Sequence, residues 1–70
     1  MTPTLHIHGP IGEGENTPPV IGGFLTANSG QPVTIVVNSF GGLASDGAAI
    51  MALLEQHGSV RAEVIGVAAS

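Results

Sequence analysis

The stretch PVTIVVNSFGGLASDGAAIMALLEQH, residues 32–57, decides the fold of this chain. Its first part, Pro32 to Val37, is rich in β-branched residues and predicts a strand that is buried on both faces, as in a parallel sheet. The next part, Asn38 to Leu43, holds two adjacent glycines and predicts a tight loop. Apolar residues at i, i+3 and i+4 then predict a helix that ends near His57. The stretch is therefore one strand–loop–helix unit.

The sequence on either side of this unit predicts three further elements. Residues 4–8 alternate apolar and polar side chains, as a half-buried strand does, and Thr17 is the expected N-cap of a helix that precedes the central strand. Ser45 or Asp46 is the expected cap of the second helix, and residues 62–67 are expected to form a third strand. Strands joined by helices are mostly parallel, with right-handed crossovers. We therefore expect residues 1–70 to belong to one α/β domain.

The chain carries little charge, and that charge is acidic. Its formal net charge is −4, and Arg61 is the single Lys or Arg. Binding to nucleic acid or to an anionic membrane surface needs several cations, so we expect neither kind of partner. No stretch approaches the roughly 20 apolar residues of a membrane-spanning helix. The sequence has no cysteine, so disulfides and thiolate metal sites are excluded.

Two short segments have residue types that suit catalysis. The first is Asn38-Ser39-Phe40-Gly41-Gly42, where a strand ends in a glycine turn whose backbone amide could face a developing oxyanion. The second is Gly66-Val67-Ala68-Ala69-Ser70, where a strand ends in small residues and a hydroxyl group. Taken singly, an ordinary strand-to-helix loop and a helix-capping or terminal serine explain them better than catalysis does.

Together, and at this spacing, the two segments resemble those of the Clp protease proteolytic subunit and of the Clp-like peptidases that process phage capsid precursors. The corresponding strings in those families are Asn-Ser-Pro-Gly-Gly and Gly-Gln-Ala-Ala-Ser. The resemblance extends to residues 5–12 and 49–54, and so to essentially the whole chain. It implies the spiral α/β fold that Clp proteases share with crotonases, with residues 1–70 as its N-terminal part, cut off at the nucleophile.

The resemblance also implies roles for particular residues and partners. Ser70 matches the nucleophile of a serine endopeptidase, and Gly41 matches an amide donor of the oxyanion hole. Gly41, Gly42 and Leu43 match the edge that binds extended substrate backbone. The implied substrates are proteins or peptides. The Asn-Ser-Phe-Gly-Gly variant and the short polar N-terminus make the phage type the better match, and its substrates are capsid or scaffolding proteins. A homo-oligomeric ring, a cytoplasmic location (including a prohead in the host cytoplasm) and the absence of any cofactor or metal are implied as well.

Three departures from the family pattern bear on activity. Phe40 stands where the family has proline, and Val67 stands where it has glutamine. The residues that would follow Ser70, including the second oxyanion amide, the histidine base and its acid, are not in this sequence. We therefore expect the 70-residue chain to be inactive by itself. Two other hypotheses remain: a crotonase-type enzyme acting on acyl-CoA thioesters, and a fragment without catalytic function.

The three histidines do not replace the missing base. His57 is expected at the far end of a helix about 18 Å long, away from the Gly-Gly turn, where the helix dipole explains it. His6 and His8 are two residues apart on one face of a strand, and two histidines need further ligands to hold a metal. We predict no metal site.

Overall fold

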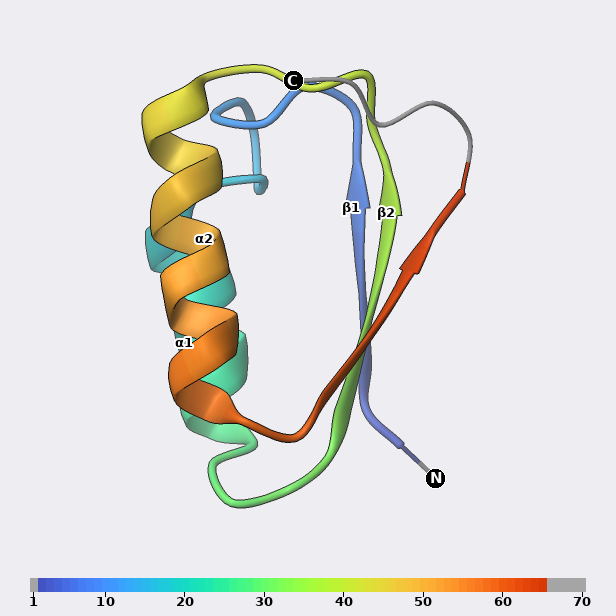
Figure 1. Cartoon of the computed structure of the whole chain (residues 1–70), viewed down its shortest axis with the longest axis vertical. Helices are drawn as coiled ribbons and strands as arrows, with labels where there is room; N and C mark the ends of the chain where they lie inside the picture. Colours follow the sequence, from blue (N-terminus) through green and yellow to red (C-terminus); the bar gives the residue numbers. More distant parts are fainter. Residues whose placement is uncertain (1, 66–70) are drawn as a thin grey trace.

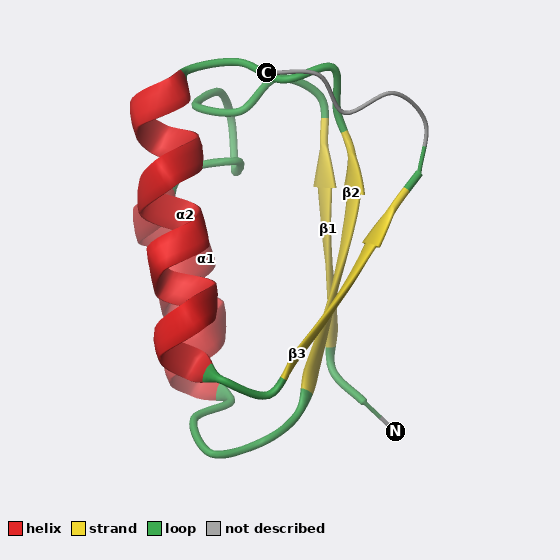
Figure 2. Cartoon of the chain, in the orientation of Figure 1, coloured by secondary structure: helices red, strands yellow, loops and turns green. Residues whose placement is uncertain are grey.

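The strand β2 (Val33–Asn38) is the centre of the sheet in the computed structural model, which describes residues 2–65. It lies between β1 (Thr4–His8) and β3 (Val60–Val64), and both neighbours are parallel to it. The helices α1 (Pro18–Ala27) and α2 (Ala44–His57) connect the strands and lie side by side on one face of the sheet (Figures 1 and 2). The predicted α/β order with a parallel sheet is confirmed.

The core lies between this face of the sheet and the two helices. β2 contributes Val33 and Ile35, which are 1% and 0% exposed. The register pairs Leu5 with Ile35 and Ile7 with Val37, so β1 presents its apolar residues to the same layer. The helices cover them with three buried side chains: Ile21, Leu25 and Ile50. The predicted burial of β2 is confirmed on its second face too, because Val36 is also buried.

The start of α2 differs from the prediction. The helix begins at Ala44 with Leu43 as its N-cap, and no side chain caps it, so the expected cap at Ser45 or Asp46 is wrong. The cause is a tertiary contact. Leu43 donates its N–H to the Ile11 carbonyl over 3.0 Å, and its own carbonyl accepts the first hydrogen bond from Gly47. The backbone partner of Leu43 therefore sets the start of the helix.

The third strand begins earlier than predicted. It spans Val60–Val64 instead of starting at Ala62, because Gly58 ends α2 at a positive φ of 88° and Val33 pairs at once with Val60. The last two positions of the predicted strand, 66 and 67, lie outside the described residues. Thr17 is the N-cap of α1 as predicted, with Pro18 following it, although its side chain makes no capping hydrogen bond.

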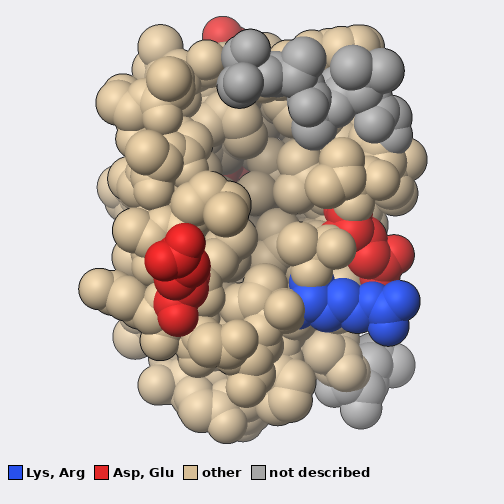
Figure 3. Space-filling model, viewed as in Figure 1, with Lys and Arg blue, Asp and Glu red and all other residues tan. Residues whose placement is uncertain are grey.

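The surface of the described residues carries few charges. In the view of Figure 3 the single basic patch, Arg61, lies beside acidic atoms. Its Nε is 3.6 Å from Oε2 of Glu63, in an exposed pair. Within residues 2–65, neither helix has the length and apolar character needed to cross a membrane.

Candidate functional site

The loops that follow β1 and β2 meet at one edge of the sheet. Both strands are parallel, so their carboxyl ends lie together, and the two loops run beside each other at the end marked by the arrowheads (Figure 1). Gly9 donates its N–H to the Asn38 carbonyl over 3.1 Å, which extends the β1–β2 ladder beyond the strands. In open α/β sheets this edge is where ligands usually bind.

An isolated parallel bridge between Ile11 and Gly42 joins the two loops. Ile11 donates its N–H to the Gly41 carbonyl over 2.9 Å, and its carbonyl accepts the N–H of Leu43 over 3.0 Å. A Cβ on Gly42 would lie 2.9 Å from the Ile11 Cα and still closer to the Ile11 backbone N and O. Position 42 therefore requires glycine, since any side chain would separate the loops.

The bridge leaves one edge of the 41–43 segment open. Ile11 uses the carbonyl of Gly41 and the N–H of Leu43, so the N–H and carbonyl of Gly42 are directed to the other side. Within the described part of the chain neither group has a hydrogen-bond partner. An N–H and a carbonyl presented together at such an edge can pair with the backbone of one more extended chain.

Ser39 is buried at the base of this loop, with 4% of its surface exposed. Its Oγ accepts the N–H of Gly41 and donates to the Gly41 carbonyl, and each distance is 3.1 Å. The amide that the sequence predicted as an oxyanion donor thus already has a partner inside its own loop. The same carbonyl also accepts the N–H of Ile11, so all hydrogen-bonding groups of Gly41 are engaged.

Two apolar side chains stand on either side of the glycine pair. Phe40 is 84% exposed and Leu43 is 58% exposed. Neither fills the core, although Leu43 lies close enough to Gly12 that an added Cβ there would be 2.8 Å from its Cδ1. The open backbone edge is therefore flanked by apolar surface, which suits a peptide with apolar side chains better than a charged ligand.

Asn16 is a residue that the sequence analysis missed. It is buried, and its Nδ2 donates to the carbonyls of His8 and Pro10 over 2.7 and 3.1 Å. Its own carbonyl accepts the N–H of Gly12 over 2.7 Å. Asn16 therefore folds the loop that presents Ile11 to Gly42. The available signal was an asparagine in a glycine-rich loop, since such side chains often bond nearby backbone.

The structure places some of the predicted site residues and not others. Gly41, Gly42 and Leu43 come together with Ile11 as one bridged unit at the edge of the sheet. Ser70, predicted as the nucleophile, lies outside the described residues, as does the whole segment 66–70. The proximity of the nucleophile to the oxyanion loop therefore stays a prediction.

The histidines lie apart from this loop. His6 and His8 are exposed on β1 beside a shallow pocket of about 400 Å³ that Glu13, Glu15 and Asn16 also line. Among residues 2–65, no three His, Asp or Glu side chains gather closely enough to hold a metal ion.

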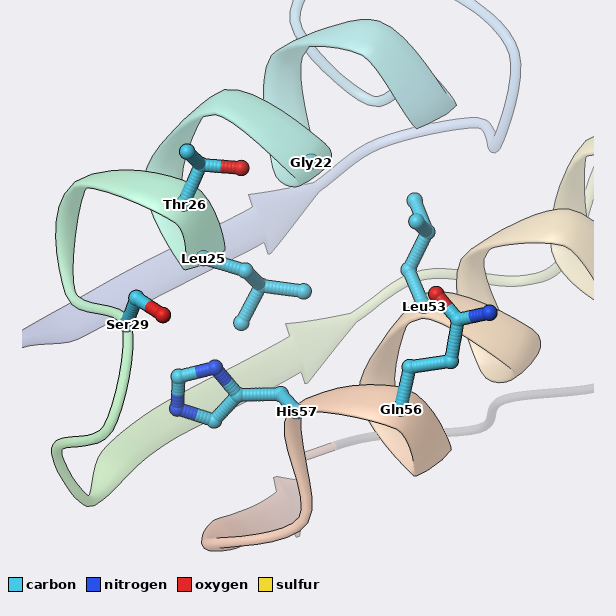
Figure 4. A pocket seen from close by; sticks show the side chains of 7 residues that line it. All are labelled: Gly22, Leu25, Thr26, Ser29, Leu53, Gln56 and His57. Carbon is cyan, nitrogen blue, oxygen red and sulfur yellow. The ribbon is translucent and has the colours of Figure 1, made fainter.

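His57 lies at the opposite end of α2, about 20 Å along the helix from its first residue. Its Nε2 is 2.6 Å from the Gln31 carbonyl, so it joins the helix end to the loop before β2. Figure 4 shows it at a pocket of about 300 Å³ between the last turns of the two helices. Two leucines, a glycine and four polar residues line this pocket: Gly22, Leu25, Thr26, Ser29, Leu53, Gln56 and His57.

No protein-family model, curated protein or solved structure matches this chain.

Proposed function

We propose that this chain carries the oxyanion loop and the nucleophile of a serine endopeptidase of the Clp type, with the spiral fold of that family. Ser70 would attack the peptide carbonyl, and the Gly41 amide would stabilise the resulting oxyanion. The histidine base and its acid would come from outside the 70 residues, because His57 is at the far end of α2 and His6 and His8 are exposed on β1.

One observation carries this proposal. The N–H and the carbonyl of Gly42 face away from Ile11 and have no partner among the described residues, at the carboxyl edge of a parallel sheet. A peptidase needs its substrate extended, and pairing with a backbone edge both extends the substrate and aligns its carbonyl groups. The glycines at 41 and 42 let that backbone approach without a side chain in the way.

The surroundings of the edge support a protein or peptide substrate. Phe40 and Leu43 are exposed apolar residues beside the edge, and the chain has a single Lys or Arg. An acyl-CoA enzyme would need cations for the phosphates of its cofactor-like substrate. In the phage version of the proposal the substrates are capsid or scaffolding proteins inside a prohead, and the full enzyme is a homo-oligomeric ring.

Titration of the ¹⁵N-labelled chain with two probes tests the proposal. The first is a capped heptapeptide of apolar residues, and the second is acetyl-CoA. We expect the peptide to shift the amide signals of Gly41, Gly42 and Leu43, while those of Leu53 and Gln56 at the distant pocket stay in place. Shifts with acetyl-CoA alone would favour the acyl-CoA enzyme, and no shift with either would favour a chain without catalytic function.

A matched pair of variants sharpens this titration. Phe40→Ala removes an exposed apolar side chain beside the edge, and we expect it to weaken peptide binding several-fold. Met51→Ala removes another accessible apolar side chain, 57% exposed on α2, and should leave binding unchanged. Equal effects of the two substitutions would indicate non-specific apolar association and would contradict a site at the loop.

A further inference from the structure

We infer that Ser39 is a positioning residue for the oxyanion amide, and that its hydroxyl must release the Gly41 N–H before that N–H can bind an oxyanion. This inference rests on the proposed function. It starts from a conflict within the loop: the N–H that the reaction would use is already donated to Ser39 Oγ over 3.1 Å.

The hydroxyl of Ser39 is well placed to hold this amide. It is buried directly after β2, so the strand fixes its position, and it bonds both the N–H and the carbonyl of the same residue. The N–H direction of Gly41 is consequently set by a side chain, where a glycine alone would leave it free. Ser39 thus keeps the peptide plane of Gly41 in one orientation while the site is empty.

The 41–43 loop stays in position when the Ser39 hydroxyl releases the Gly41 N–H. The Gly41 carbonyl retains the N–H of Ile11, and the Leu43 N–H retains the Ile11 carbonyl. Release of the N–H therefore breaks one of the two hydrogen bonds between Ser39 and Gly41 and leaves the bridge between the loops in place. An oxyanion is a stronger acceptor than a neutral hydroxyl, so it can displace Ser39 from the amide. The expected cost of the competition is one neutral hydrogen bond, which corresponds to roughly a fivefold weaker affinity.

The first part of the test needs no ligand. Amide hydrogen exchange of the whole 70-residue chain should show Gly41 protected in the wild type and at least several-fold less protected in Ser39→Ala. Ser39→Thr keeps a hydroxyl and should restore most of the protection. Ser45→Ala, the same change at an exposed serine of α2, should leave Gly41 unaffected. Equal exchange at Gly41 in the wild type and all three variants would overturn the inference.

The second part uses a peptide boronic acid as a mimic of the oxyanion. In alkaline buffer its trigonal boron takes a hydroxide ion to form a fourth boron–oxygen bond, and the oxygens of the resulting tetrahedral boronate anion can accept the Gly41 N–H without a covalent bond to the chain. We expect Ser39→Ala to bind this probe about five times more tightly than the wild type, and Ser45→Ala to bind it as the wild type does. Equal or weaker binding by Ser39→Ala would contradict the competition.

The two parts separate the inference from the proposed function. If no variant binds the boronic acid, the endopeptidase proposal is contradicted, while the exchange of Gly41 still decides whether Ser39 holds the amide. The melting temperature of each variant, compared with that of the wild type, shows whether faster exchange at Gly41 is local or reflects a general loss of structure. Should Ser39→Ala unfold, Ser39→Thr replaces it, with Ser45→Ala as its control. Gly41 is then expected to exchange nearly as slowly in Ser39→Thr as in the wild type and Ser45→Ala, and fast exchange in the wild type would oppose the inference.

Discussion

β2 and β3 lie side by side in the same sheet and run in the same direction, yet their surroundings differ sharply. β2 is buried along most of its length, with Ile35 fully covered by the helix layer. β3 is almost wholly exposed, and Val64 retains 60% of its accessible surface although the register places it beside Val37. Figure 1 shows β3 diverging from the helix layer toward its carboxyl end.

The comparison shows that sheet register alone does not bury a strand. Both strands have full ladder pairing with a parallel neighbour, but the helix layer covers β1 and β2 and reaches β3 at its first residue, Val60. At the carboxyl end of β2, Ser39 and Ile11 hold the following loop by side-chain and backbone hydrogen bonds. A preorganised site requires such fixed backbone. β3, by contrast, is continued by a hydrogen bond from the Ile65 N–H to the Val37 carbonyl and by no side-chain contact of this kind among the described residues.

The largest expected effect comes from shortening a side chain in each strand. Ile35→Ala leaves a cavity in the core and should lower the free energy of unfolding by about 2–5 kcal/mol. Val64→Ala removes a similar group from the exposed strand and should cost less than about 1 kcal/mol. Urea unfolding monitored by circular dichroism measures both. Ile35→Val, expected to cost about 0.5–1.5 kcal/mol, replaces Ile35→Ala if the latter does not fold. Equal losses in the two strands would contradict the comparison.

The buried side of this contrast was predictable from particular residues, whereas the exposure of β3 was not predicted. The β-branched run of residues 33–37 identified a strand buried on both faces, and the alternation of residues 4–8 identified the half-buried β1. Periodicity reports which side of an element is apolar, but it does not report which backbone edges meet. The bridge of Ile11 to Gly42 joins segments far apart in sequence, so neither it nor the helix start that it sets at Ala44 was visible.

The candidate site was predictable in part for the same reason. The Gly-Gly turn could be located from its residue types, and its position after a parallel strand followed from the order of the elements. The engagement of the Gly41 amide by Ser39 depends on one side-chain rotamer. The support from Asn16 depends on how a glycine-rich loop folds back on itself. Sequence patterns describe neither.

The second prediction concerns the glycine at the rigid end of β2. Gly42→Ala places a methyl group against the Ile11 backbone and should destabilise the chain by about 1–3 kcal/mol. Gly47→Ala is the matched control, because a Cβ there has no neighbour within 4 Å and α2 gains a better helix former. It should stabilise the chain by about 0.5–1 kcal/mol. Thermal unfolding of the two variants tests the sign, and destabilisation by both would mean that the Ile11 contact is not the cause.

The third prediction concerns Asn16, the side chain that holds the loop between β1 and α1 in place beside the Gly-Gly turn. Asn16→Ala leaves the carbonyls of His8 and Pro10 without their donor and should cost about 1–2 kcal/mol. Asn28→Ala removes one hydrogen bond to the Phe24 carbonyl at the end of α1 and should cost about half as much. Amide exchange at Ile11 and Leu43 adds a local readout. These two amides should lose protection in Asn16→Ala and keep it in Asn28→Ala, and the reverse pattern would exclude a supporting role for Asn16.

The smallest effect is expected on β3, where the single cation of the chain lies. Arg61 and Glu63 form an exposed pair at 3.6 Å, with 78% and 48% of the side chains accessible. Exposed pairs of this kind are screened by water and salt, so Arg61→Ala should change the free energy of unfolding by less than about 0.5 kcal/mol. Raising the salt concentration to about 1 M should abolish even that difference, since the Debye length falls to about 3 Å. A loss above about 1 kcal/mol that persists in salt would mean that Arg61 packs through its aliphatic stem, and β3 would then be better covered than its exposure indicates.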